Sequence, residues 1–131
     1  MQMFFNAKSI VVIGASRTPG HVGYVILENL KAGYKGTIHA VNPHASEILG
    51  IACFPSVLSI KEDIELAVVA VPSESVLGVV SECGKKGIKN IVMVTAGFNE
   101  VGNNSLQAQL ERLLKKYKIR CIGPNCLGIY D

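Results

Sequence analysis

The chain has 131 residues, of which 49% are hydrophobic and 18% charged, so its composition is that of one globular domain and excludes a disordered or fibrous protein. The net charge of +3 is mild, so the scattered lysines favour solvated helix ends over a nucleic-acid-binding surface. No apolar run reaches the length of a membrane span, and no signal peptide is recognisable. The four cysteines form no CxxC pair, and we expect reduced thiols in a cytoplasmic protein.

Five short runs rich in β-branched residues are predicted to form strands. In chain order they are Ser9–Ile13, Thr37–Val41, 66–71, 90–94 and 119–122. The first, third and fourth are continuously apolar, which is typical of parallel strands buried on both faces. The second and fifth are weaker and are expected at the edges of the sheet.

Helical patterns separate most of these strands. Apolar residues at helical spacing predict helices over 20–32, Ser73–Lys86 and Asn104–Tyr117. Between the second and third strands, 45–49 and 55–60 each favour a single helical turn, with Ser56 or Ser59 near a cap. This alternation predicts an α/β fold, a doubly wound, mostly parallel, Rossmann-like sheet of five to six strands in the order 3-2-1-4-5. Ligands of such sheets bind beyond the carboxyl ends of the strands.

The first strand leads into a glycine-rich loop that departs from the usual G-x-G-x-x-G pattern. Gly14 permits a tight turn, and Ser16 stands where the second glycine is expected and offers a hydroxyl and an amide N–H. Gly20 and Gly23 allow close approach of the backbone to a ligand and of the helix to the sheet. The helix start then favours an anion, to which Arg17 adds a positive charge. The loop is therefore predicted to bind phosphate, rather than to serve strand–helix packing alone.

The end of the second strand bears on which nucleotide is bound. NAD-binding domains usually place a carboxylate here to hold the ribose hydroxyls. This chain instead has Asn42, Pro43 and His44. Asparagine can still bond a ribose, and His44 is a weak substitute for the basic residue that NADP would need. The pattern disfavours NAD without excluding it.

The other strand ends carry smaller signals. Pro72 should stop the third strand, and Ser73 is favoured as a cap of the next helix over a ligand contact. The fourth strand ends in small residues at 95–97, which leave room for a ligand but also suit an ordinary turn. The fifth ends in a tight loop over 123–128, whose Cys126 has no histidine near it in the sequence and is not predicted to be catalytic. We find no metal site and no hydrolase triad.

Taken in order, these segments resemble the CoA-binding domain of ADP-forming acyl-CoA (acetyl-CoA) synthetases, a family related to the α subunit of succinyl-CoA synthetase. That family catalyses acyl-CoA + ADP + phosphate ⇌ acid + CoA + ATP through an acyl phosphate and a phosphohistidine. The resemblance implies coenzyme A, as CoA or acyl-CoA, as the ligand. The implied contacts are Gly14, Ala15, Ser16, Arg17, Pro19, Gly20, Asn42, Pro43, Val71, Pro72, Ser73, Thr95, Ala96, Gly97, Asn125 and Cys126.

The resemblance also implies what this chain does not do alone. The family's phosphohistidine domain and its ATP-grasp domain are not recognised in 1–131. We therefore expect one CoA-binding domain, the N-terminal part of a longer protein, with further ligase domains or subunits as partners and neither nucleic acid nor membrane. Relatives commonly have lysine after the Asn-Pro pair, where this chain has His44. Two alternatives stay open: a stand-alone CoA-binding or regulatory protein, and an NAD(P)-binding oxidoreductase domain.

Overall fold

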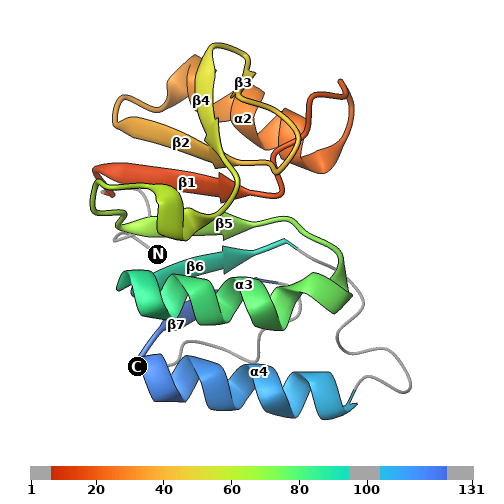
Figure 1. Cartoon of the computed structure of the whole chain (residues 1–131), viewed down its shortest axis with the longest axis vertical. Coiled ribbons are helices and arrows are strands. Elements are labelled where there is room, and N and C mark those ends of the chain that lie inside the picture. Colours follow the sequence, from red (N-terminus) through yellow and green to blue (C-terminus); the bar gives the residue numbers. More distant parts are fainter. Residues whose placement is uncertain (1–6, 95–103, 124–131) are drawn as a thin grey trace.

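The computed structural model describes residues 7–94 and 104–123. Within them the chain forms a seven-stranded sheet with three α-helices and one 3-10 turn (Figure 1). The elements in chain order are β1 (Ser9–Ile13), α2 (Val22–Gly33), β2 (Thr37–Val41), β3 (Glu47–Ile48), β4 (Ile51–Phe54), η1 (Val57–Ser59), β5 (Leu66–Val69), α3 (Ser73–Lys86), β6 (Asn90–Met93), α4 (Asn104–Tyr117) and β7 (Arg120–Ile122).

The strands lie in the order β3-β4-β2-β1-β5-β6-β7, and every neighbouring pair is parallel except β3 and β4. In Figure 1 α3 and α4 cover one face of the sheet, and α2 lies on the other. β1 is central, because Ile13 is in register with Val41 of β2 on one side and with Val69 of β5 on the other. The predicted doubly wound, Rossmann-like α/β fold is confirmed.

The predicted strand order is wrong in one respect. The predicted order put the run at 66–71 at the edge of the sheet, next to the second strand. In the structure this run forms β5, which pairs with β1, and it is β4 that pairs with β2. β3 and β4 form a hairpin in the region where 45–49 was expected to be helical. Leu49 and Gly50, with φ of 53° and 78°, form its two-residue turn, because successive positive φ angles match the twist of a hairpin. With β4 counted as the third strand, the parallel order becomes 3-2-1-4-5-6.

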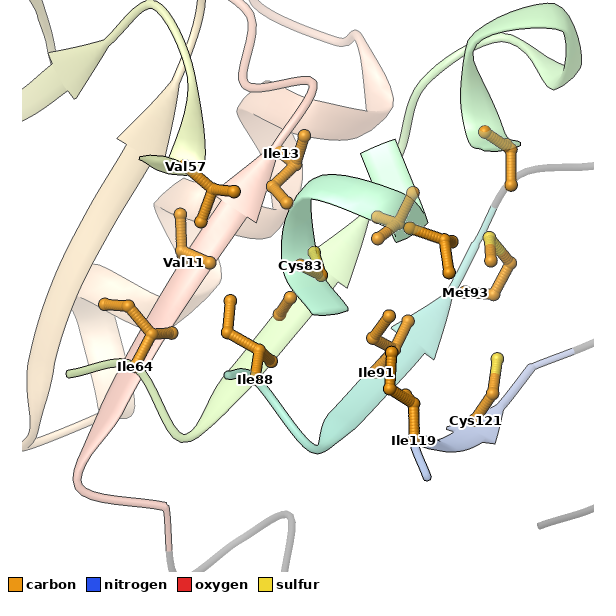
Figure 2. Packing of buried hydrophobic residues seen from close by; sticks show 14 of the residues in the cluster. Val11, Ile13, Val57, Ile64, Cys83, Ile88, Ile91, Met93, Ile119 and Cys121 are labelled. Atoms are coloured by element: carbon orange, nitrogen blue, oxygen red, sulfur yellow. The ribbon is translucent and has the colours of Figure 1, made fainter. Parts of the chain in front are cut away.

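The helices form where the apolar spacing predicted them. α3 carries Glu74 in its first turn and lysines in its last, which complements the helix dipole, and it ends at Gly87 in the left-handed conformation. The predicted turn at 55–60 is present as η1, where the Ser56 hydroxyl accepts a hydrogen bond from the Leu58 N–H. Figure 2 shows the core beneath α3, where Val11 of β1 and Ile91 of β6 lie on the same face as Cys83 of the helix.

The cysteines differ in environment. Burial, with a smaller effect from the charge of Glu82, raises the pKa of the Cys83 thiol to about 12. Cys53 is a free, half-buried thiol whose pKa burial also raises. Cys121 is disulfide-bonded, which contradicts the expectation of four reduced thiols. That expectation rested on the missing CxxC pair, and sequence spacing does not fix which sulfur atoms the fold brings together. None of the described helices is long and apolar enough to cross a membrane.

Candidate functional site

The loop between β1 and α2 is packed tightly against the end of β5. Gly14 has a φ of +96°, and a Cβ at this position would lie 2.3 Å from the Ala70 carbonyl oxygen. A Cβ on Gly23 would lie 2.1 Å from the Gly14 carbonyl oxygen. The first turn of α2 therefore sits directly on the end of β1. Gly20 differs, because its φ is +90° but a Cβ there would meet no protein atom within 4 Å. Its conformation, and not close packing within the protein, favours glycine.

Ser16 organises the loop through its hydroxyl. Its Oγ accepts a hydrogen bond from the Thr18 N–H at 3.0 Å and lies 3.2 Å from Nδ1 of His21. Because the hydroxyl also has a proton to donate, the two contacts can be made at once. This interaction between Ser16 and His21 was not predicted. Its only sequence signal is a histidine that immediately precedes the helix, five residues after the serine.

The start of α2 is electropositive. His21 is the N-terminal cap residue in an extended conformation, and its side chain makes no capping hydrogen bond. The first turn of α2 contains no acidic residue. Arg17 and His21 are exposed on the loop itself, and His44 is exposed on the segment that follows β2. Backbone N–H groups of a helix start, aided by the positive charge of Arg17, can hold a phosphate.

Asn42 joins the ends of β1 and β2. Its Nδ2 donates to the Ala15 carbonyl at 2.9 Å, and its Oδ1 accepts from the His44 N–H at 2.7 Å. The Asn42 backbone N–H also donates to the Phe54 carbonyl at 3.0 Å. Both polar ends of the side chain are thus engaged within the protein. The geometry supports a role in fixing the glycine-rich loop, whereas the sequence pointed only to a ligand contact.

The end of β5 supplies the third side of the site. The Ala70 N–H donates to the Ile13 carbonyl at 2.8 Å, which holds this end of β5 against the end of β1. Pro72 is the cap residue of α3, and Ser73 is the first residue of the helix. The prediction that Ser73 caps α3 is therefore wrong, because Ser73 is already the first residue of the helix and the cap position belongs to Pro72. Glu74 lies in the first turn, where its charge complements the helix dipole.

The structure brings most of the predicted residues to one edge of the sheet. Parallel register places the carboxyl ends of β1, β2 and β5 side by side. The predicted residues at these three ends, and on the loop between β1 and α2, are Gly14, Ala15, Ser16, Arg17, Pro19, Gly20, Asn42, Pro43, Val71, Pro72 and Ser73. Thr95, Ala96, Gly97, Asn125 and Cys126 lie outside the described residues. Among the described residues, no group of histidine, cysteine or carboxylate side chains could hold a metal ion.

Comparison with known proteins identifies the family of the chain. Residues 8–131 match the CoA binding domain family. The chain is 53% identical to an ADP-forming acetate–CoA ligase of Methanocaldococcus jannaschii, over 95% of this chain and 18% of that protein. A dinucleotide-forming acetyl-coenzyme A synthetase 1 of Candidatus Korarchaeum cryptofilum superposes with a TM-score of 0.89 at 43% identity, over 95% of this chain and 27% of that one.

A smaller protein has the same fold along nearly its whole length. A conserved hypothetical protein from Pyrococcus furiosus superposes with a TM-score of 0.73 at 28% identity, over 92% of this chain and 96% of that one. The chain thus spans less than a third of the ligase and the synthetase but nearly all of this protein. The match to the family covers almost every residue, including the glycine-rich loop. The chain therefore belongs to the CoA-binding domain family.

Proposed function

We propose that this chain is the CoA-binding module of an ADP-forming acid–CoA ligase, and that the loop between β1 and α2 holds the phosphates of CoA. The observation that supports this role most directly is the loop itself. The Ser16 hydroxyl and the Asn42 amide order it, and it ends at a helix start whose N–H groups have no side-chain cap. Anions bind at helix starts of this kind.

The other contacts in this proposal follow the order of the strands. Arg17 adds positive charge beside the phosphates, while Asn42-Pro43 and Val71-Pro72-Ser73 flank the adenosine part. The pantetheine arm passes Thr95, Ala96 and Gly97, and the thiol end lies near Asn125 and Cys126. In this arrangement the chain binds and orients CoA and contributes no catalytic residue. The described free cysteines agree with this, because burial raises the pKa of both Cys53 and Cys83 and disfavours their thiolates.

The complete reaction in this proposal is acyl-CoA + ADP + phosphate ⇌ acid + CoA + ATP. Curated relatives with this activity are several times longer than the chain. We infer that the chain is one domain, the N-terminal part of a longer protein, and that a phosphohistidine domain and an ATP-grasp domain supply the remaining steps. CoA bound at the carboxyl edge of the sheet would present its thiol to those domains.

A stand-alone CoA-binding protein is the second candidate. It is favoured by the Pyrococcus furiosus structure, which has this fold over nearly its whole length. An NAD(P)-binding oxidoreductase domain fits less well, because the end of β2 carries no carboxylate for the ribose and the Asn42 amide is already bonded within the protein.

Calorimetric titration of the chain with CoA, acetyl-CoA, NAD and NADP tests the proposal. We expect CoA and acetyl-CoA to bind and NAD to bind at least about tenfold more weakly, a difference of about 1.4 kcal/mol. Ser16→Glu should abolish CoA binding, because a carboxylate would face the bound phosphates. The matched control is Ser81→Glu on α3, away from the loop. Preference for NAD, or unchanged CoA affinity in a folded Ser16→Glu variant, would refute the assignment.

A further inference from the structure

Ser16 and His21 form a hydrogen-bonded pair within the glycine-rich loop, and the direction of their bond depends on the charge of the imidazole. Ser16 Oγ lies 3.2 Å from Nδ1 of His21 and accepts the Thr18 N–H at 3.0 Å. A serine hydroxyl has one proton to donate and two lone pairs that accept. Because the Thr18 N–H occupies one lone pair, the bond to His21 uses either the hydroxyl proton or the second lone pair.

The charge state of His21 decides which of the two is used. A neutral imidazole with its proton on Nε2 accepts the Ser16 hydroxyl proton at Nδ1, and the hydroxyl then has no proton left for a ligand. A protonated imidazole has a proton on both nitrogens, so Nδ1 donates to Ser16 Oγ. Both lone pairs of Oγ are then engaged, and the hydroxyl proton is free to donate to a phosphate oxygen. Protonation of His21 therefore turns Ser16 into a donor toward a ligand.

The ionisable groups of the elements that meet at this edge make the pair sensitive to an anion. Arg17 is exposed on the same loop, and His44 is exposed on the segment after β2. The first acidic residue of α2 is Glu28, about two turns into the helix, and α3 carries Glu74 in its first turn. A helix N-terminus carries roughly half a positive charge, so a proton on His21 adds to positive charge in the free chain. A bound phosphate group, with a charge of about −1.5 to −2, reverses this balance.

We propose that His21 is a positioning residue that couples CoA binding to the uptake of a proton. The bound phosphates favour its protonated form, and that form turns the Ser16 hydroxyl toward them. This inference rests on the proposed function, because it takes the glycine-rich loop as the site of the CoA phosphates. Binding and protonation are linked reciprocally, so CoA should bind more tightly at low pH and should raise the pH at which His21 titrates. Histidine is the side chain that ordinarily changes charge between about pH 5 and 8, so the coupling falls in the physiological range.

Calorimetric titration with CoA in two buffers of different ionisation enthalpy measures the protons taken up on binding. We expect the natural chain to take up about 0.3–0.5 proton per CoA more than His21→Gln at the pH of maximal uptake. Its affinity should fall about three- to tenfold more than that of the variant between about pH 5.5 and 8. Glutamine is uncharged over this range but can still hydrogen-bond Ser16. The 3′-phosphate of CoA also titrates near pH 6, but it does so with both proteins and cancels in the difference.

His44→Gln is the matched control. The chain has three histidines, of which His39 is buried, so His44 is the other exposed one. This variant should keep the proton uptake of the natural chain. Equal uptake by the natural chain and His21→Gln would overturn the proposal, and so would uptake that is lost in His44→Gln instead.

Nitrogen chemical shifts of the His21 ring follow the change in the bond directly. Without CoA and above about pH 8, we expect the ring proton on Nε2, because Nδ1 accepts the Ser16 hydroxyl proton. CoA should move the titration midpoint of the ring up by about 0.5–1 pH unit, which matches the three- to tenfold change in affinity. A neutral ring with its proton on Nδ1, or an unmoved midpoint, would overturn the proposal. These results leave CoA binding itself intact, whereas a natural chain that binds no CoA at any pH would refute the proposed function as well.

Discussion

Replacing Asn42 with alanine removes the side chain that joins the ends of β1 and β2. The variant loses the hydrogen bond to the Ala15 carbonyl and the one from the His44 N–H. Each is worth about 1 kcal/mol net, so the ordered state of the glycine-rich loop should lose roughly 1–2 kcal/mol relative to disordered states. If CoA binds the ordered loop, its affinity should fall about 5- to 30-fold, because binding must then supply the ordering free energy.

Calorimetry measures the affinity, and hydrogen exchange of 14–21 without ligand measures the order of the loop. A positioning role predicts faster exchange in Asn42→Ala before any CoA is added. Asn90→Ala is the matched control, since its amide also donates to a backbone carbonyl, that of Glu65, but at the opposite edge of the sheet. Weaker CoA binding with unchanged exchange would refute the reasoning and would make Asn42 a direct ligand contact.

Two further predictions concern stability. Gly14→Ala should cost roughly 2–4 kcal/mol in urea unfolding, and Gly20→Ala only about 1–2 kcal/mol, because both have positive φ but only Gly14 faces a backbone oxygen at 2.3 Å; equal losses would contradict this packing. The pKa of the Cys83 thiol is raised from 9.0 to about 12 in the folded protein. The protonated thiol therefore stabilises the folded state fully below pH 9.0, and this contribution is lost progressively as the pH rises toward about 12. The unfolding midpoint should therefore fall less steeply with pH between these values in Cys83→Ala, and an identical slope would show that the thiol does not titrate differently on unfolding.

Local patterns were sufficient to predict the parts of the fold with strong periodicity. α3 and α4 begin and end at the predicted residues, because apolar spacing and terminal charge agree there. The hairpin of β3 and β4 was missed because these strands are only two and four residues long. Its turn places Leu49 at positive φ, a conformation that leucine rarely adopts and that the sequence therefore does not indicate. Because β4 was not predicted, β5 was counted as the third strand and assigned the position beside β2 that β4 occupies.

In the site, too, features set by neighbouring residues could be predicted, whereas features set by distant contacts could not. The phosphate loop could be predicted because strand, glycines and helix follow one another along the chain. The roles of Asn42 and His21 could not, because each depends on a partner that the fold brings close. Asn42 bonds Ala15, which is 27 residues earlier in the sequence. His21 faces Ser16 because the loop turns back on itself, and residue spacing alone does not specify that turn.

The two-residue strand β3 also affects how the domain meets other molecules. An open sheet has unpaired N–H and C=O groups along its outermost strands, and these can template pairing with another chain. Here one edge is closed by a strand of only two residues, beside which the Lys31 ammonium donates to the Leu49 carbonyl at 2.6 Å. The opposite edge is β7, which has three residues. Within residues 7–94 and 104–123, both edges therefore offer little backbone for intermolecular pairing, which limits edge-to-edge aggregation of a sheet with an apolar, largely parallel interior.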